Sequence, residues 1–364
     1  MKSCIDTAKP HTIKKFELIE EYVDGWARKL LGYDASKGVI FIDCMCNCGI
    51  YFDENKIQID GTAIRVAKKL NEVNEKHKKD VKLYFNDFSS EKVEVLKAEL
   101  QKYELSNIQL EYSTGDANTY LKRFNLCNFQ NHNTLLFYDP YNAMVDWEAV
   151  DPFLNRWGEV IINHMVSDAP RAAKQAKKES EIKRYEALYR KKIDELIQIG
   201  NDKVALEEII QDIIIEQTKD FPNKRYIASF PFYIRTNQLA YNLIHCSANA
   251  AGFNLFKKSA WKVFGGQSAS KRTKGIKGQF VLDTGSGEAV VSGTAETDGV
   301  YTVYDMANYI FNRYNAKGEI PFDAIYEDLA NHPIFPCEGY RKEMKEALSM
   351  RDGVTIKKSS IVFG

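Results

Sequence analysis

The sequence predicts an α/β fold in which a mostly parallel β-sheet is covered by helices on both faces. Five short apolar runs alternate with stretches that have the spacing of amphipathic helices. Each run ends in small or polar residues, as strands do at the ligand-binding edge of open α/β sheets. Two further apolar runs, after residue 224, are close enough to pair as an antiparallel hairpin at the end of the sheet.

The composition is that of an ordinary globular protein, with 364 residues, 44% of them apolar and 27% charged. Lysine and arginine together number 50, as do aspartate and glutamate, so the net charge identifies no partner. Seven cysteines, an odd number without disulfide spacing, favour a reducing compartment, and we expect a cytoplasmic protein. No apolar run is long enough to span a membrane, and we expect no membrane partner.

The chain begins with an amphipathic helix and a first strand. Apolar residues recur at helical spacing between residues 11 and 31, and Gly32 follows as the expected end of that helix. Residues 38–43 form a short apolar run that closes on Asp43. A cysteine-rich loop, CMCNCG at 44–49, comes next, and Gly61 opens a helix that extends to about residue 77.

Two more strand–helix units follow the same pattern. Residues 82–85 form a strand that ends at Asn86-Asp87, and a helix over 89–103 follows, with Ser89 and Ser90 both as N-cap candidates. Residues 108–112 form the third strand, which ends at Gly115, Asp116, Ala117 and Asn118.

The fourth strand, residues 135–138, is apolar throughout, as expected of a strand buried on both faces. It must end at Asp139, because Pro140 lacks an N–H group and disfavours helix at the residue before it. Residues 159–163 form the fifth strand. Right-handed crossovers place the ends of all five strands on one edge, so we expect four acids in one cleft: Asp43, Asp87, Asp116 and Asp139.

Residues 170–218 are rich in lysine, glutamate, alanine and isoleucine, and predict an insertion of two helices with a solvated face. A surface that binds a partner protein is the alternative interpretation of this insertion. Strands over 225–234 and 238–246, joined at Thr236-Asn237, predict the terminal hairpin, and a helix over 248–263 completes a first domain spanning 1–265.

A basic linker, residues 266–292, follows this domain. Residues 253–282 hold seven lysines or arginines and no acid. Two interpretations stay open: a solvated loop, or a contact to phosphates that gives a salt-dependent affinity for nucleic acid. In the second case the nucleic-acid-binding residues are Lys271, Arg272, Lys274 and Lys277.

The last segment, residues 293–364, predicts a small separate module. Helices are expected over 304–314, 321–330 and 340–350, and strands over 353–357 and 360–363. Three helices followed by a β-hairpin are typical of a winged helix, a relative of the helix-turn-helix that binds DNA or proteins.

Taken together, these segments resemble a known family. Five parallel strands, a helical insertion and a terminal antiparallel hairpin are the order of class I S-adenosylmethionine-dependent methyltransferases, whose sheet is Rossmann-like. More narrowly, the chain resembles the three-Cys-motif partner proteins of bacteria. The resemblance rests on HTIKKFELIEEYVDGW (11–26), FIDCMCNCGIY (41–51), Gly61-Thr62-Ala63, Asp139-Pro140-Tyr141, Trp147, IINHMVSDAPR (161–171) and LAYNLIHCSANAAGF (239–253).

The resemblance implies a cofactor site for S-adenosylmethionine. Its methionine part is expected near Asp43, Cys44, Cys46 and Gly49. Asp87 is expected to accept hydrogen bonds from the ribose hydroxyls. Asp116, with Ala117 beside it, is expected to contact the adenine amine.

The resemblance also implies a catalytic segment, Asp139-Pro140-Tyr141. It is similar to the (Asp/Asn)-Pro-Pro-(Tyr/Phe) motif of amino-group methyltransferases, with one proline missing. In that motif the acid and the proline carbonyl accept hydrogen bonds from the target nitrogen, while the aromatic ring stacks on the base. The expected reaction is N-methylation of a nucleobase in DNA or RNA.

The cysteines depart from the methyltransferase pattern, because Cys44, Cys46 and Cys48 stand where glycine, alanine or proline is expected. A zinc site is disfavoured, because the spacing is tight and the chain has no second cysteine pair. We therefore predict no metal and interpret the three as small side chains that fill a turn. The degenerate loop leaves an alternative function open: an inactive methyltransferase-like protein that binds nucleic acid or a three-Cys-motif partner protein.

Overall fold

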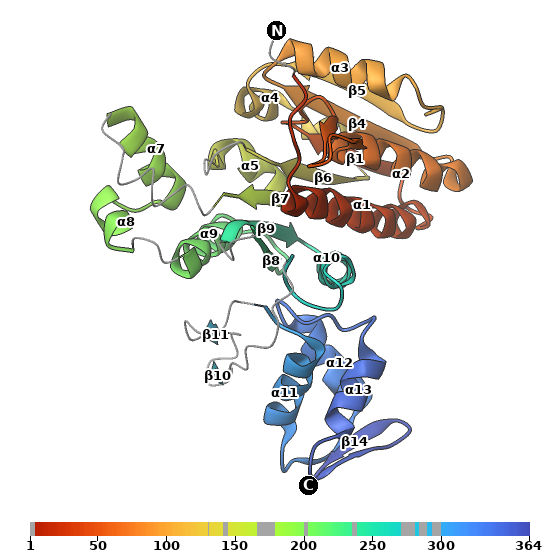
Figure 1. The fold of residues 1–364 in the computed structure, drawn as a ribbon, viewed down its shortest axis with the longest axis vertical. Coiled ribbons are helices and arrows are strands. Elements are labelled where there is room, and N and C mark those ends of the chain that lie inside the picture. Colours follow the sequence, from red (N-terminus) through yellow and green to blue (C-terminus); the bar gives the residue numbers. More distant parts are fainter. Residues whose placement is uncertain are drawn as a thin grey trace.

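The computed structural model describes residues 4–129, 131–140, 145–165, 179–199, 203–234, 239–270, 281–283, 290–292 and 300–364. A seven-stranded sheet with its helices forms one body of the molecule, and a helical insertion projects from its side (Figure 1). The C-terminal helices form a second body, joined to the first where helix α10 lies (Figure 1).

The central sheet has the strand order β5-β4-β1-β6-β7-β9-β8. Its first five strands pair in parallel and β9 is antiparallel to both of its neighbours, which confirms the predicted mostly parallel sheet. The chain leaves β1 toward β4 and β5, then returns to place β6 on the other side of β1. The seven strands are β1 (Gly38–Asp43), β4 (Asp80–Asp87), β5 (Gln109–Thr114), β6 (His132–Tyr138), β7 (Gly158–His164), β8 (Tyr226–Tyr233) and β9 (Leu239–Ser247).

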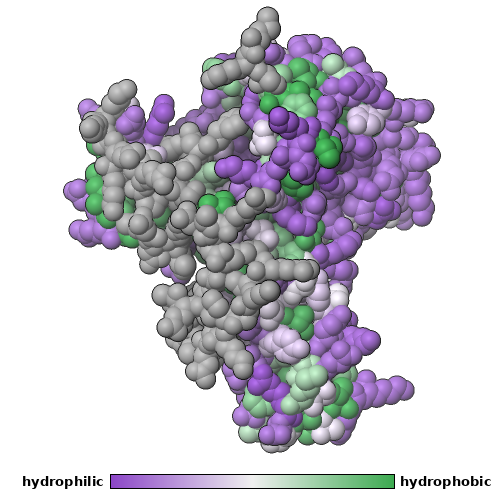
Figure 2. All heavy atoms as spheres, viewed as in Figure 1, coloured by the Kyte–Doolittle hydropathy of each residue, from purple (hydrophilic) through white to green (hydrophobic). Residues whose placement is uncertain are grey.

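Alternate residues of the central strands pack into two separate hydrophobic cores. Phe41 and Phe137 point into the core beneath α1, α2 and α10, whereas Ile42 and Leu136 point into the core shared with α5 and the insertion. The visible surface over α2 and α3 is largely hydrophilic (Figure 2). The helices are α1 (Pro10–Leu31), α2 (Thr62–His77), α3 (Ser90–Leu100), α4 (Ala117–Arg123), α5 (Trp147–Leu154) and α10 (Ala250–Val263).

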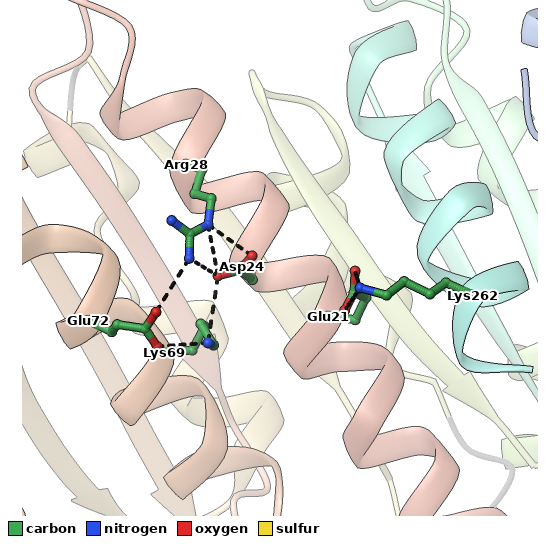
Figure 3. Close-up of polar contacts among 6 residues, drawn as sticks. All are labelled: Glu21, Asp24, Arg28, Lys69, Glu72 and Lys262. Carbon is green, nitrogen blue, oxygen red and sulfur yellow. Dashed lines mark hydrogen bonds and ion pairs between the residues drawn. The ribbon is translucent and has the colours of Figure 1, made fainter. Parts of the chain in front are cut away.

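Helix α1 lies between α2 and α10 and contacts both. Its apolar stripe is buried, and ion pairs lie along its two solvent edges (Figure 3). On the α10 side, Lys262 Nζ lies 2.7 Å from Glu21 Oε1. On the α2 side the group comprises Asp24, Arg28, Lys69 and Glu72. Exposed pairs of this kind contribute about 0–1 kcal/mol each, so burial of the apolar stripe holds α1 in place.

The insertion contains three helices in its described part, so the prediction of two was wrong. The break between the first two falls at Arg190, whose φ of 50° lies in the left-handed region, which a right-handed helix cannot continue through. The three are α7 (Glu179–Tyr189), α8 (Ile193–Ile199) and α9 (Lys203–Gln217).

A buried polar network ties this insertion to the sheet. The carboxylate of Glu207, on α9, accepts hydrogen bonds from Ser229 of β8 and Asn242 of β9, and lies 3.0 Å from Nδ1 of His164 on β7. Burial alone would raise the pKa of Glu207, but the hydrogen bonds to His164, Ser229 and Asn242 outweigh it and hold that pKa below its usual value. Tyr189 of α7 completes the network through His164 Nε2, 3.0 Å away.

The short elements escaped sequence analysis, because a three-residue strand is too brief to show a period of two. Helix α5 was also missed, since Pro152 lies inside it. The short elements are the hairpin β2 (Ile50–Phe52) and β3 (Gln58–Asp60), the 3-10 helix η1 (Leu126–Phe129), β10 (Val281–Asp283) and β11 (Val290–Ser292).

The C-terminal body contains the three helices and two strands at nearly their predicted positions, together with a further strand, β12. Strand β14 pairs antiparallel with both β12 and β13. The elements are α11 (Val303–Tyr314), β12 (Gly318–Pro321), α12 (Phe322–Asn331), α13 (Arg341–Ser349), β13 (Val354–Ile356) and β14 (Ser360–Phe363).

Helix α10 joins this C-terminal body to the sheet through buried polar contacts. The ammonium of Lys257 donates to the carbonyl oxygens of Leu329, Ala330 and His332 at 2.9, 3.2 and 2.6 Å, at the end of α12. The side chain of Lys257 thus caps the C-terminal end of α12, where a helix leaves backbone carbonyls in need of donors. Trp261 Nε1 donates to another carbonyl nearby.

Several predictions fall outside the described part of the chain. These are the basic residues Lys271, Arg272, Lys274 and Lys277, and the turn at Thr236-Asn237. Of the helices that are described, none combines the length and apolar character needed to cross a membrane.

Replacing Glu207 with alanine should destabilise the protein by about 3 kcal/mol, because it removes the acceptor shared by His164, Ser229 and Asn242 and leaves them buried. Urea denaturation followed by circular dichroism measures the loss. Glu216→Ala is the control, since Glu216 lies on the same helix and makes only an exposed pair with Lys219. Equal stabilities of the two variants would contradict a role for the buried network.

Candidate functional site

The carboxyl ends of the parallel strands bring the predicted acids to one edge of the sheet. Asp43 ends β1, and its register partners are Phe85 on β4 and Phe137 on β6. Asp87 and Asp139 each lie two residues beyond those partners, one on either side of Asp43. The chain continues from β1 to β4 on one side and later returns to β6 on the other side, so the strand order reverses between β1 and β6. Open α/β sheets bind ligands at the carboxyl ends of the strands beside such a reversal.

The three cysteines of the loop after β1 point into the cores. Cys44 packs in the core shared with α5, whereas Cys46 and Cys48 pack in the core beneath α1. The loop turns through left-handed conformations at Asn47, with φ 57°, and Gly49, with φ 73°. A Cβ on Gly49 would lie 2.4 Å from Leu96, so glycine is required there for both conformation and space. Cysteine therefore replaces small residues in this loop by packing its side chains into the cores.

Burial also keeps these thiols protonated. It raises the pKa of Cys44 and Cys46 well above the usual value, and that of Cys48 to about 11. The thiolate is the form that binds metals and attacks electrophiles, so the buried thiols are poor candidates for either role. A search of the described ranges finds no group of three His, Cys, Asp or Glu side chains placed to hold a metal ion.

Asp87 braces the cysteine loop. Its two oxygens accept hydrogen bonds from the backbone N–H groups of Asn47 and Ser89, each at 2.9 Å. Its neighbour Asn86 donates to the carbonyls of Cys44 and Gly115, each at 3.0 Å. The end of β4 thus fixes the loops that follow β1 and β5.

Phe88, directly after Asp87, is an aromatic side chain that sequence analysis missed. It is 82% exposed, although a phenylalanine ring in water loses the free energy that burial provides. The sequence does show Phe88 as an aromatic residue directly after the acid that ends a strand. An exposed ring at this edge is placed to stack on a planar ligand.

Asp116 lies at the exposed N-terminus of α4, with Ala117 as the first residue of that helix. Its Oδ1 accepts hydrogen bonds from the backbone N–H and the hydroxyl of Thr119, both at 2.8 Å. These bonds, the backbone one first, lower the pKa of Asp116. The second carboxylate oxygen has no hydrogen bond to Thr119 and can accept one from a ligand.

Asp139 is held between two side chains that sequence analysis did not select. Lys15 of α1 donates to its Oδ2 at 2.5 Å, and Asn163 of β7 donates to its Oδ1 at 2.5 Å. Side-chain alternation along β6 turns Asp139 toward the same face as Phe137, which is the face that α1 covers. Lys15 could have been selected from the sequence as a lysine within an apolar stripe, because it lies on the buried face of α1 with Ile19.

The rest of the predicted catalytic segment is only partly described. Pro140 is buried beside Asp139, and Tyr141 lies outside the described residues. Two aromatic rings lie near the ammonium of Lys15: its Nζ is 6.0 Å from the centroid of Phe137 and 5.4 Å from that of Tyr241. The carboxylate of Asp139 and these two rings together favour a nitrogen that is positively charged or carries N–H groups.

Asp43 is the acid whose ionisation the site changes most. Burial, and then the charge of Asp139, raise its pKa to about 8, against the opposing influence of the Met45 N–H group and Lys15. Asp43 is therefore largely protonated at neutral pH and can donate a hydrogen bond. The carboxyl edge of the sheet thus combines a neutral acid, a carboxylate bound by a lysine and a carboxylate bound by backbone N–H groups.

Comparisons with known proteins give likenesses to solved structures only. An rRNA methylase from Streptococcus thermophilus is 10% identical, with 61% of this chain and 93% of that chain covered and a TM-score of 0.30. An O-methyltransferase from Bacillus cereus, in complex with SAH, is 9% identical over 63% and 80% of the two chains, with a TM-score of 0.33. Trm1 from Pyrococcus horikoshii, in complex with S-adenosyl-L-methionine, is 11% identical over 96% and 78%, with a TM-score of 0.38.

No family model matches the sequence, and no curated protein matches it. The three-Cys-motif partner family therefore stays a resemblance carried by the quoted segments.

Replacing Asp43 with asparagine should flatten the pH dependence of stability. Between pH 3.8 and about 8 the folded protein retains a proton on Asp43 that the unfolded chain releases. Folding therefore binds a proton, and the free energy of unfolding falls as pH rises through this window. Asparagine does not titrate, so its curve should lack that decline. Denaturation at several pH values between 5 and 8 measures the difference.

Asp116→Asn is the matched control, because the lowered pKa of Asp116 places its effect below this window. Parallel curves for wild type and Asp43→Asn would show that Asp43 is ionised in the folded protein.

Proposed function

We propose that the protein is an S-adenosylmethionine-dependent methyltransferase that acts on an amino nitrogen of a nucleobase in DNA or RNA. The observation that carries this proposal is the sheet itself. Its order β5-β4-β1-β6-β7-β9-β8, with the single antiparallel strand β9 next to last, is the arrangement implied by the resemblance to class I methyltransferases. The acids then lie at the edge where such a sheet binds its ligand.

The residues present at this edge fit the cofactor. The cysteine side chains of the 44–49 loop pack into the cores, which leaves the backbone of this loop as the part offered to the methionine part. Each oxygen of Asp87 retains a lone pair for a ribose hydroxyl after accepting one backbone N–H. Phe88 offers a ring to the adenine, and Asp116 offers an oxygen to its amine.

S-adenosylmethionine, when bound, supplies an electrophilic methyl group. The protein's part is to hold the target nitrogen in line with that methyl, which is a matter of positioning more than of acid–base chemistry. Asp139 and the Pro140 carbonyl accept hydrogen bonds from the target amino group. Lys15 and Asn163 each occupy one lone pair of Asp139 and fix the plane of its carboxylate, leaving further lone pairs for the substrate. Tyr141 is assigned the stacking role by resemblance.

A second candidate function is binding without catalysis. The observation that favours it is the C-terminal order helix, strand, helix, helix, strand, strand, with β14 between β12 and β13. We interpret residues 293–364 as a winged-helix-like module, distinct from a methyltransferase-like domain at 1–265 and the basic linker at 266–292. In this interpretation α13 contacts nucleic acid or a three-Cys-motif partner protein.

Calorimetry with S-adenosylmethionine and S-adenosylhomocysteine should detect one binding site per chain. Phe88→Ala should weaken both ligands by roughly five- to hundredfold, as expected from the loss of one base–aromatic stack of about 1–3 kcal/mol. Tyr304→Ala is the control, because Tyr304 is an exposed aromatic residue of the C-terminal body. Wild-type protein that binds neither ligand would exclude the enzymatic proposal and leave the binding function.

Asp139→Ala should leave cofactor affinity nearly unchanged and reduce methyl transfer at least a hundredfold, roughly 3 kcal/mol of transition-state stabilisation. Transfer of labelled methyl to unmodified RNA and DNA measures the rate. Asp139→Asn, which keeps an acceptor oxygen, should be milder.

Because Asp139→Ala leaves Lys15 without its partner, the variant that also carries Lys15→Met separates the loss of catalysis from the loss of stability. Full turnover in a folded Asp139→Ala variant would remove Asp139 from the mechanism.

A further inference from the structure

A cavity of about 680 Å³ opens at the amino edge of the sheet, opposite the edge that carries the aspartates. Ser36 lies two residues before β1, His132 is the first residue of β6, and Trp157 directly precedes β7. These three residues, which lie at the starts of three adjacent parallel strands, all line the cavity. Its volume is in the usual range for small-molecule sites, about 300–1,000 Å³. The proposed methyl transfer uses no residue of this edge.

Two exposed aromatic side chains flank the cavity. Tyr33 is 64% and Trp157 is 56% exposed. The ring of Trp157 is held by Phe221, which also lines the cavity and packs against it in a T-shaped arrangement with centroids 6.0 Å apart. The guanidinium of Arg225 lies over Phe221, 3.6 Å from its ring centroid. An exposed indole held in this way can stack on a planar ligand.

His132 supplies a polar group that lacks a partner in the protein. Its side chain is 10% exposed, and its Nε2 lies 3.0 Å from Asp80 Oδ2. Nε2 must carry the proton of the neutral ring to donate to that carboxylate, which leaves Nδ1 as a bare acceptor. Nδ1 is buried and has no hydrogen-bond partner. A buried acceptor in this state favours a ligand that brings an N–H or O–H donor.

The remaining lining defines the charge and the polarity of the ligand. Amide side chains come from Asn131, Asn133 and Asn155, and each carries both a donor and an acceptor. The residues that line the cavity include no carboxylate, and the one charged residue among them is Arg156. This set disfavours a cationic ligand and suits a neutral or anionic one that is planar and has several hydrogen-bonding positions on its edge.

We propose that this cavity binds a nucleobase, as a free nucleoside or nucleotide or as one unit of a single strand. The base stacks on Trp157, an N–H group on its edge donates to Nδ1 of His132, and the asparagine amides bind its other polar positions. This site is separate from the cofactor cleft and does not depend on the proposed methyl transfer.

Tryptophan fluorescence gives a local reading of this binding. Of the four tryptophans, Trp26, Trp147 and Trp261 are buried, so Trp157 is the one that reports on an exposed site. Adenosine, guanosine, cytidine and uridine are titrated separately, and at least one should quench the emission with saturation. A parallel titration with a single-stranded oligoribonucleotide distinguishes a free nucleoside from a base within a strand. Tighter binding of the oligoribonucleotide than of the nucleoside indicates a base within a strand.

Equilibrium dialysis with labelled adenosine then tests the residues. Trp157→Ala should weaken binding roughly five- to hundredfold, the loss of one stacked base. His132→Phe should weaken it as well, with folding checked by circular dichroism. N6,N6-dimethyladenosine, whose exocyclic nitrogen has no N–H, should bind the unaltered protein more weakly than adenosine, which tests the same hydrogen bond without a mutation.

Tyr304→Ala is the matched control, because Tyr304 is an exposed aromatic residue of the C-terminal body that belongs to neither proposed site. Adenosine binding that persists in Tyr304→Ala and falls in Trp157→Ala supports the proposal. Adenosine binding that Trp157→Ala leaves unchanged would overturn it. Failure of every nucleoside to quench the fluorescence or to be retained in dialysis would also overturn it.

Discussion

The parallel pairing of β1 with both β4 and β6 is the constraint on which the rest of the structure depends. It aligns Asp43 with Phe85 and Phe137, and so places Asp87 and Asp139 just beyond Asp43 on its two sides. Parallel strands need crossover helices, and these helices cover both faces of the sheet and exclude water from it. Burial of the strand ends then raises the pKa of Asp43, so the acid–base character of the cleft follows from the pairing.

Charged groups buried by this architecture are each compensated by a specific partner. Lys15 on the buried face of α1 meets Asp139, Glu207 of α9 meets three donors, and Lys257 of α10 meets carbonyls at the end of α12. An unpaired buried charge is costly, so each of these contacts fixes the position of one segment relative to another. The N-terminal helix, the insertion and the C-terminal body are thereby attached to the same sheet at defined places.

The two edges of the sheet present contrasting chemistry. The carboxyl edge carries acids and suits hydroxyl groups, amines and a cationic cofactor. The amino edge carries amides, an acceptor imidazole nitrogen and exposed aromatic rings, and its lining includes no carboxylate. A parallel sheet produces this separation because its strands all begin at one edge and all end at the other. Two ligands can therefore bind the same sheet without competing for one surface.

The sequence by itself determined that five strands end on one edge of the sheet, which acids follow them, and where the loop of small residues after β1 lies. Those features are local, because an apolar run, a proline or an N-cap acts within a few residues. Asp43, Asp87, Asp116 and Asp139 could be selected for that reason.

Only the tertiary structure decided which distant side chains meet them. Lys15 is 124 residues from Asp139, and Asn163 reaches it from a different strand. The exposure of Phe88 is known only from the folded structure, and the cavity beside Trp157 is assembled from four separate segments. Such contacts form only when the strands pair in register and the helices pack against the sheet. Sequence patterns within a few residues therefore carry no information about them.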